Sequence, residues 1–225
     1  MKFAITILVS LFAAGVSCQE PNLFSSHSDW NKGFESLRIG MTVAELLALR
    51  PDAKVSEFDK ADMRADDPRV VDLDRSEYIK NVPAEGVNLV ARYTITDQKL
   101  EEIIFIWVGP FEVIKTLRAS FVRFCMDNFG KDFQPVAMEQ NANGPERHIA
   151  PLMCWNVGRL SVSASCTPDT EGMPLEHGAL SLAAEPENEK AFPHIAKQKS
   201  AEKGIDDAAR RRVFQAAGID IPPTK

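Results

Sequence analysis

The clearest pattern in the chain is a strict alternation of apolar and polar residues near its middle. The apolar positions are Val87, Leu89, Ala91, Tyr93 and Ile95. A period of two predicts a half-buried β-strand over about 87–96. Asp97 and Gln98 mark a tight turn, and 99–109 is rich in β-branched and aromatic residues. We therefore expect a β-hairpin whose second strand is most deeply buried near Phe105 and Trp107.

A short helix is predicted upstream, over about Val43–Leu49. Thr42 and Glu45 have the spacing of a capping box, in which each side chain bonds the backbone N–H of the other residue. Pro51 ends the helix, because the residue before a proline avoids the α region. A helix of two turns is marginal alone in water. We therefore expect it to dock on a sheet.

A second helix is predicted over 111–130 from a stripe of apolar residues three or four positions apart. Its members are Ile114, Leu117, Phe121, Cys125 and Phe129. Gly130 stands where a left-handed residue would end the helix.

Two further strands are expected on either side of a Gly158-Arg159 turn, with Val157 opposite Leu160. This register predicts a core face made of Met153, Trp155, Val157, Leu160, Val162, Ala164 and Cys166. It predicts a polar face made of Cys154, Asn156, Ser161, Ser163 and Ser165. A slip of one residue would exchange the two faces. The stretch 178–186 is expected to be one more strand.

The region 52–86 is less regular. Within it, 69–74 fits a short edge strand and 76–86 fits a helical turn and a loop. The pattern predicts an α+β fold with two helix-plus-antiparallel-sheet repeats, αββ over 35–110 and αβββ over 111–188. The helices are expected to pack on one face of the sheet.

The two ends of the chain differ from this middle. Residues 1–17 have one Lys, an apolar run and small residues, the pattern of a signal peptide. Residues 18–34 are interpreted as a linker that becomes ordered near Trp30. The basic tail 189–225 is predicted to hold a short helix from Asp206 to Ala217 on a mobile linker. That helix is either a solvated basic helix or a contact for an acidic partner or anionic lipid.

Composition narrows the function classes. The chain has 225 residues, of which 44% are hydrophobic, and a net charge of −6. These values are ordinary for a globular protein and argue against a general nucleic-acid binder, which needs a basic surface.

The four cysteines lead to two predictions, a lipid on Cys18 and a disulfide among the other three. The residues before Cys18 resemble a bacterial lipobox, in which the cysteine is lipidated, although Gly15 stands where Leu is usual. Ordinary cleavage near Ser17 or Cys18 is the alternative. In an exported chain a disulfide is expected. Cys125 and Cys166 share the core side of the predicted fold, so Cys125 is better placed for Cys166 than for Cys154.

The first predicted helix and hairpin together resemble a known repeat. "IGMT" followed by "AELL", a loop and "YTITDQKLEEIIF" looks like the SmpA/OmlA (BamE-like) repeat, over roughly 37–108. That repeat is related in fold to the tandem domains of β-lactamase inhibitor proteins. The usual Leu-Gly-x-Pro helix exit is replaced here by Leu49-Arg50-Pro51. The resemblance implies an envelope protein that binds other proteins through an exposed sheet face, without a cofactor.

A search for catalytic motifs finds no nucleophile elbow, no H-E-x-x-H and no Gly-rich phosphate loop. The acidic stretch 59–74 places Asp72 and Asp74 on one strand face, where two carboxylates would suit Ca²⁺, but no calcium-loop spacing accompanies them. We predict no metal site and no catalytic residue.

The sequence therefore favours an exported, non-catalytic protein-binding or envelope-assembly module. We expect a periplasmic or outer-membrane-anchored location, with the membrane contacted only through a lipid on Cys18. The expected partner is another envelope protein, bound by Asn156, Ser161, Ser163 and Ser165. A ligand-binding or enzyme-inhibitor protein is one alternative, and an exported hydrolase is another.

Overall fold

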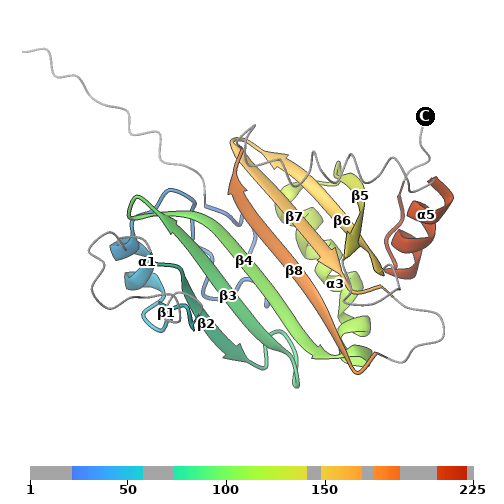
Figure 1. Ribbon diagram of the computed structural model, residues 1–225, viewed down its shortest axis with the longest axis horizontal. Coiled ribbons are helices and arrows are strands. Elements are labelled where there is room, and N and C mark those ends of the chain that lie inside the picture. Colours follow the sequence, from blue (N-terminus) through green and yellow to red (C-terminus); the bar gives the residue numbers. More distant parts are fainter. Residues whose placement is uncertain (1–21, 58–72, 141–147, 169–174, 188–206, 222–225) are drawn as a thin grey trace, which may run out of the picture.

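The computed structural model describes residues 22–57, 73–140, 148–168, 175–187 and 207–221, and it has an α+β fold built on one antiparallel sheet of eight strands (Figure 1). The strands are β1 (Lys54–Val55), β2 (Arg75–Lys80), β3 (Asn88–Thr96), β4 (Lys99–Pro110), β5 (Gln134–Gln140), β6 (His148–Val157), β7 (Leu160–Cys166) and β8 (His177–Pro186). The helices are α1 (Val43–Leu49), α3 (Phe111–Phe129) and α5 (Asp207–Ala216).

The strand order across the sheet is β1-β2-β3-β4-β8-β7-β6-β5. Each group of four strands forms a meander, and β4 pairs with β8 at the centre. This arrangement leaves the short β1 at one edge and β5 at the other.

The predicted α1 is confirmed, together with its capping box. The backbone N–H of Glu45 donates to the Thr42 hydroxyl over 3.2 Å, and the backbone N–H of Thr42 donates to the Glu45 carboxylate over 2.8 Å. Just before the helix, Gly40 and Met41 exchange backbone hydrogen bonds with Leu100, each 2.8 Å long. Those bonds fasten the start of the helix to β4, as expected of a helix too short to be stable alone.

Both predicted hairpins are confirmed with their turns. Asp97 and Gln98 have positive φ angles of 51° and 59°, as a type I′ turn requires. In the second hairpin Val157 pairs with Leu160, the register expected from the sequence. The predicted core face of β6 and β7 is therefore buried, but Cys154 and Ser161 of the predicted polar face are buried too.

Three strands lie outside the expected set. Arg75–Lys80 is the strand β2, where a helical turn was predicted; it pairs with β3 along its length. Gln134–Gln140 is the strand β5, in a stretch whose Pro135, Gly144 and Pro145 favour a loop by sequence alone. A proline lacks the backbone N–H but is tolerated on an edge strand. With the two-residue β1, each half of the sheet has four strands.

Helix α3 matches its prediction except at its end. Ile114, Phe121 and Cys125 are fully buried. Gly130 caps the helix, and its N–H donates to the Met126 carbonyl over 2.9 Å. Its φ of 97° is positive, but its ψ of 166° is extended rather than left-handed helical. The chain therefore leaves the helix directly toward β5.

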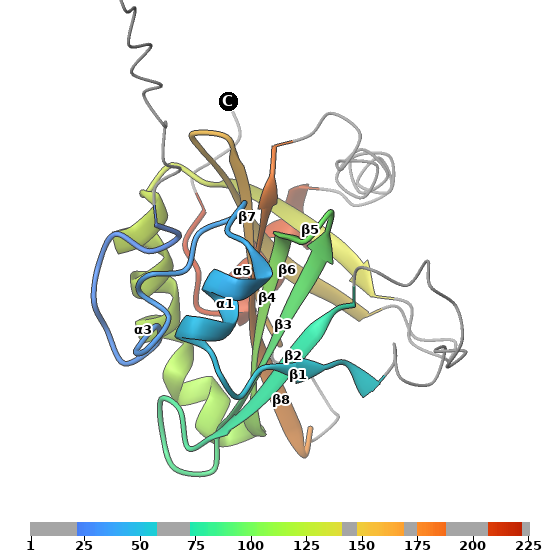
Figure 2. The same ribbon diagram turned by 90° about the vertical axis from the view of Figure 1, so that its left-hand side faces the viewer.

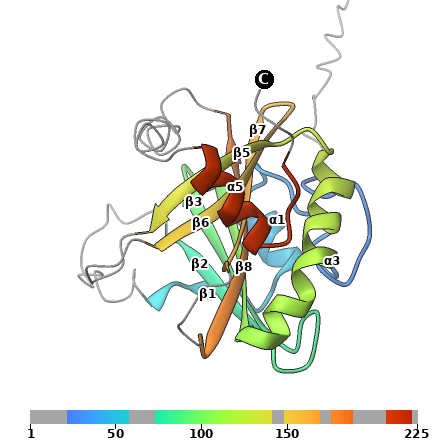
Figure 3. The ribbon, with the colours of Figure 1, turned by 90° about the vertical axis from the view of Figure 1, so that its right-hand side faces the viewer.

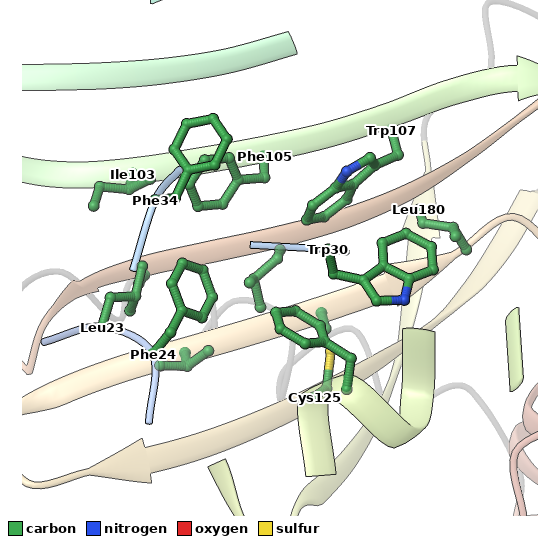
Figure 4. Close-up of a cluster of buried hydrophobic side chains, with 14 of the residues drawn as sticks. Leu23, Phe24, Trp30, Phe34, Ile103, Phe105, Trp107, Cys125 and Leu180 are labelled. Carbon is green, nitrogen blue, oxygen red and sulfur yellow. The ribbon is translucent and has the colours of Figure 1, made fainter. Parts of the chain in front are cut away.

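The helices lie on one side of the sheet, as predicted (Figures 2 and 3). Between α1, α3 and the sheet is a core of aromatic side chains (Figure 4). Trp30 packs edge-on against Trp107 with ring centroids 5.3 Å apart, and Phe34 packs against Phe105 at 4.9 Å. This side of the sheet is called the helix face below.

The N-terminal segment corrects the expected linker. Ordered packing begins before Trp30, because Leu23 and Phe24 are already buried. The Phe24 ring lies 5.9 Å from that of Phe105 and 5.6 Å from that of Phe124. Residues 22–34 are therefore part of the core, since these aromatic side chains supply a large buried area.

Helix α5 corrects the expectation of a solvated basic helix. Phe214 and Ala217 are fully buried and Ile219 is nearly so. A guanidinium N–H of Arg118 on α3 donates to the Ala216 carbonyl at the end of α5 over 3.1 Å. The apolar stripe of the tail is thus a part of the main core. Within the described ranges, no helix is long and apolar enough to cross a membrane.

A candidate binding face on the open side of the sheet

The sheet has a second face, opposite the helices, which we call the open face. Figure 1 looks onto it, with α3 behind the strands. Side chains that alternate with the buried ones point to this side, and most of them on β3, β4, β7 and β8 are half-buried. The open face falls into two patches, one on each half of the sheet.

The serine patch lies on β6–β8. Asn156 is exposed at the end of β6, and Ser163 and Ser165 on β7 are half-buried. The Ser165 hydroxyl is hydrogen-bonded to that of Ser181 on β8, with 2.8 Å between the oxygens. The structure therefore brings these three predicted partner-binding residues together on one surface.

Ser161 does not fit the predicted site. Its exposed fraction is only 5%. The register sets it between Asn156 and Glu185, two residues with longer side chains. A partner on the open face would meet those side chains before it reached the Ser161 hydroxyl.

The apolar patch lies on β2–β4 and was missed by the sequence analysis. It consists of Tyr78, Val90, Ile104, Ile106 and Val108. Tyr78 is 58% exposed, and only Leu49 is also an exposed large hydrophobic side chain among the described residues. Two signals were available: Val90 interrupts the polar side of its strand, and the stretch 103–108 is apolar on both sides.

The predicted disulfide pair lies on the helix face. Cys125 on α3 and Cys166 on β7 are both buried and are free thiols in the structure. Burial raises the pKa of Cys166 to about 12, although the nearby charge of Arg118 acts in the other direction. Burial and the neighbouring Cys166 raise the pKa of Cys125 well above its usual range. The disulfide itself stays a prediction.

Cys154 lies on the other side of the sheet from this pair. It forms a small apolar cluster with Val136 and Leu152. The sheet thus separates Cys154 from Cys125, as the predicted register required.

A buried ionic network lies on the helix face of the first half. Glu77, whose side chain is 3% exposed, receives two hydrogen bonds of 2.8 Å from the Arg50 guanidinium. The Tyr93 hydroxyl donates to the same carboxylate over 2.5 Å. Arg50 also donates to the Gly33 carbonyl and lies over the Phe34 ring. The network ties the end of α1 to β2, β3 and the N-terminal segment.

The network raises the pKa values of Tyr93 and Arg50. Burial and the Glu77 carboxylate raise the pKa of Tyr93 far above its ordinary value. Burial alone would lower the pKa of Arg50, but the hydrogen bonds and charge of Glu77 outweigh that effect, so the pKa rises. Each charged group is therefore paired with an opposite charge, as buried ions require.

Cys18, the signal peptide and Asp72 lie outside the described residues. Asp74 accepts a hydrogen bond from the backbone N–H of Ile95 over 3.2 Å. Within the described ranges, no group of three or more His, Cys, Asp or Glu side chains is arranged to hold a metal ion.

Comparisons with known proteins add no relatives. No family model matches the chain, and no significant match is found among curated proteins or solved structures.

Proposed function

We propose that this chain is an exported, non-catalytic module that binds another envelope protein through the open face of its sheet. One observation carries the proposal. The three described helices pack on one face of a broad antiparallel sheet, while the other face carries the half-buried serine and apolar patches. Antiparallel sheets commonly keep one face for the core, and exposed apolar area mixed with polar groups is typical of interaction surfaces.

The element order supports a second part of the proposal, a duplicated fold. Each half begins with a helix and continues as a four-stranded antiparallel meander. Such a duplication is what a resemblance to the SmpA/OmlA repeat and to β-lactamase inhibitor proteins would imply. In both halves small or aliphatic side chains on the open face leave room for the surface of a partner.

Crosslinking in the native host tests the binding face. A photoreactive phenylalanine analogue replaces Ser163 on the serine patch or, as the matched control, the exposed Ala119 on α3. We expect one defined protein adduct from position 163 and none of that mass from position 119. Identical adduct patterns at the two positions, or no adduct at position 163, would contradict a binding role for this face.

Intact mass tests the proposed export. The mature chain is measured without reductant from membrane and soluble fractions. A chain that begins at Cys18 with added acyl groups, found in the membrane fraction, supports a lipoprotein. An unmodified chain that keeps residues 1–17 contradicts export.

A further inference from the structure

The apolar patch has a defined order across three strands. Tyr78 on β2 is opposite Val90 on β3, which is opposite Ile106 on β4. Ile104 and Val108 flank Ile106 on the same side of β4. The patch thus runs from a half-buried interior at β4 to the exposed phenol ring of Tyr78. Aromatic side chains that become buried on binding dominate the free energy of binding at many protein interfaces, and the exposed Tyr78 ring can become such an anchor.

Two cations border this patch. Lys80 and Arg92 are exposed and project from the same face as Tyr78, since their positions alternate with the buried ones. Neither is in an ion pair with a described residue. On the open side of β2 and β3 no side chain is a carboxylate, although the whole chain carries a net charge of −6. The carboxylate nearest to the patch on β4 is Glu102, which accepts a hydrogen bond from the Thr94 hydroxyl.

We propose that the apolar patch, with Lys80 and Arg92, binds an extended segment of a partner protein in which Asp or Glu residues flank aliphatic or aromatic side chains. This inference rests on the proposed function and names the chemistry of the partner. The guanidinium of Arg92 would take a carboxylate in a two-point hydrogen bond, while Lys80 supplies a point charge. The apolar side chains of the segment would cover Tyr78 and its neighbours.

Charge favours an acidic and apolar segment over an anionic lipid surface or a second copy of the chain as the occupant of the patch. Recognition of anionic lipid surfaces typically uses clusters of four to eight basic residues. Three, Lys54, Lys80 and Arg92, lie on the open side of β1–β3. A second copy of the chain laid on this patch would set the same cations against each other.

Peptide selection on the purified full chain tests the proposal. The probe is a phage-displayed library of random twelve-residue peptides. We expect selected peptides to combine acidic and apolar residues, and to bind more weakly as salt rises. The double variant Lys80→Glu/Arg92→Glu should weaken the binding at least tenfold, and Tyr78→Ala should do so too. The matched control Arg123→Glu/Lys131→Glu changes two exposed cations away from the patch and should have no effect.

Several outcomes would overturn the proposal. They are the selection of no peptide, selection without acidic residues, and binding that Lys80→Glu/Arg92→Glu leaves unchanged. A doubled mass in light scattering that this variant abolishes would assign the patch to a second copy. Sedimentation with phosphatidylglycerol vesicles that the variant abolishes would assign it to a lipid surface.

The failure of this inference is distinguishable from that of the proposed function. Peptide binding that is lost in Ser163→Arg but kept in Lys80→Glu/Arg92→Glu would leave the binding module intact and move its site to the serine patch. The absence of peptide binding together with the absence of crosslinks from position 163 would reject both. Thermal melts of every variant identify those that fail to fold.

Discussion

Neighbouring residues of one strand show how different the two faces of this sheet are. Ile103 on β4 is fully buried on the helix face, whereas Ile104 beside it is half-buried on the open face. The helix face holds aromatic rings, paired charges and two thiols. The open face holds the apolar patch in the first half, and in the second half it holds hydroxyls beside the small cluster of Val136, Leu152 and Cys154. The same strands therefore carry stability on one side and the proposed recognition on the other.

The contrast between faces extends to charge. On the helix face the Glu77 carboxylate is paired in full, because an unpaired buried charge would be costly. On the open face Lys80 and Arg92 are exposed, and neither forms an ion pair with a carboxylate among the described residues. The paired charges on the helix face stabilise the fold, whereas the exposed cations on the open face belong to the proposed recognition site.

The largest expected effect comes from the buried network. Glu77→Gln leaves Arg50 without its partner charge, and such a loss costs roughly 3–5 kcal/mol. Glu102→Gln on the open face is the control, since Glu102 is half-buried and its hydrogen bond comes from the Thr94 hydroxyl. Surface changes of that kind cost about 0.5 kcal/mol. Urea unfolding measures both, and equal losses would contradict the contrast.

The cysteines on the two faces of the sheet are expected to differ in their oxidation state. In the chain from its native host, Cys125 and Cys166 should form the disulfide and Cys154 should remain a thiol. Maleimide labelling under denaturing, non-reducing conditions should therefore modify Cys154 and spare the other two. Loss of the bridge should cost about 4 kcal/mol for a loop of roughly 40 residues. Labelling of all three thiols would rule out the bridge.

The two isoleucines of β4 measure the difference between the faces directly. Ile103→Ala removes fully buried carbon atoms and should cost about 2–5 kcal/mol. Ile104→Ala removes the same atoms from a half-buried site and should cost about 1 kcal/mol. Chemical denaturation of both variants provides the test. A larger loss for Ile104 would mean that the open face is part of a core.

The smallest expected effect is on the pH dependence of the free energy of unfolding above about pH 10. Folding raises the pKa of Tyr93, so the unfolded chain loses this proton near pH 10 while the folded chain keeps it. Its contribution to stability is thus complete below about pH 10 and falls above it, by up to about 1.4 kcal/mol per pH unit. Tyr93→Phe should therefore remove this loss of stability, which urea unfolding at a series of pH values above about 10 would measure.

The chain has only two tyrosines, which makes the control simple. Tyr78→Phe changes an exposed hydroxyl on the open face. In this variant the free energy of unfolding should fall with pH as steeply as in the wild type. A slope that is unchanged in Tyr93→Phe would show that the ionic network does not hold this proton.

Local patterns account for most of the correct predictions. The capping box at Thr42, the alternation around Tyr93 and the turn at Gly158 each act within a few residues, and each element formed where expected. The strand β2 was missed because the pattern preceding it is irregular. Its pairing with β3 gives it strand geometry that its own residues only weakly favour.

Long-range packing accounts for the corrections. Nothing in the residues around Phe24 or Phe214 shows that they belong to one core with Trp107, because these contacts join segments far apart in the sequence. The salt bridge between Arg50 and Glu77 spans 27 positions and joins a helix end to a strand. The apolar patch depends on strand order, which sets Tyr78 beside Val90.

The sequence by itself determined the main helices, the two hairpins with their registers and the face to which each of their side chains points, because periodicity and turn chemistry act locally. Only the tertiary structure decided that residues 22–34 and 207–221 join the core and that the serine and apolar patches lie on one open face. It also decided that Lys80 and Arg92 border the apolar patch. Those features depend on which strands become neighbours, and that choice is made by the packing of the whole chain.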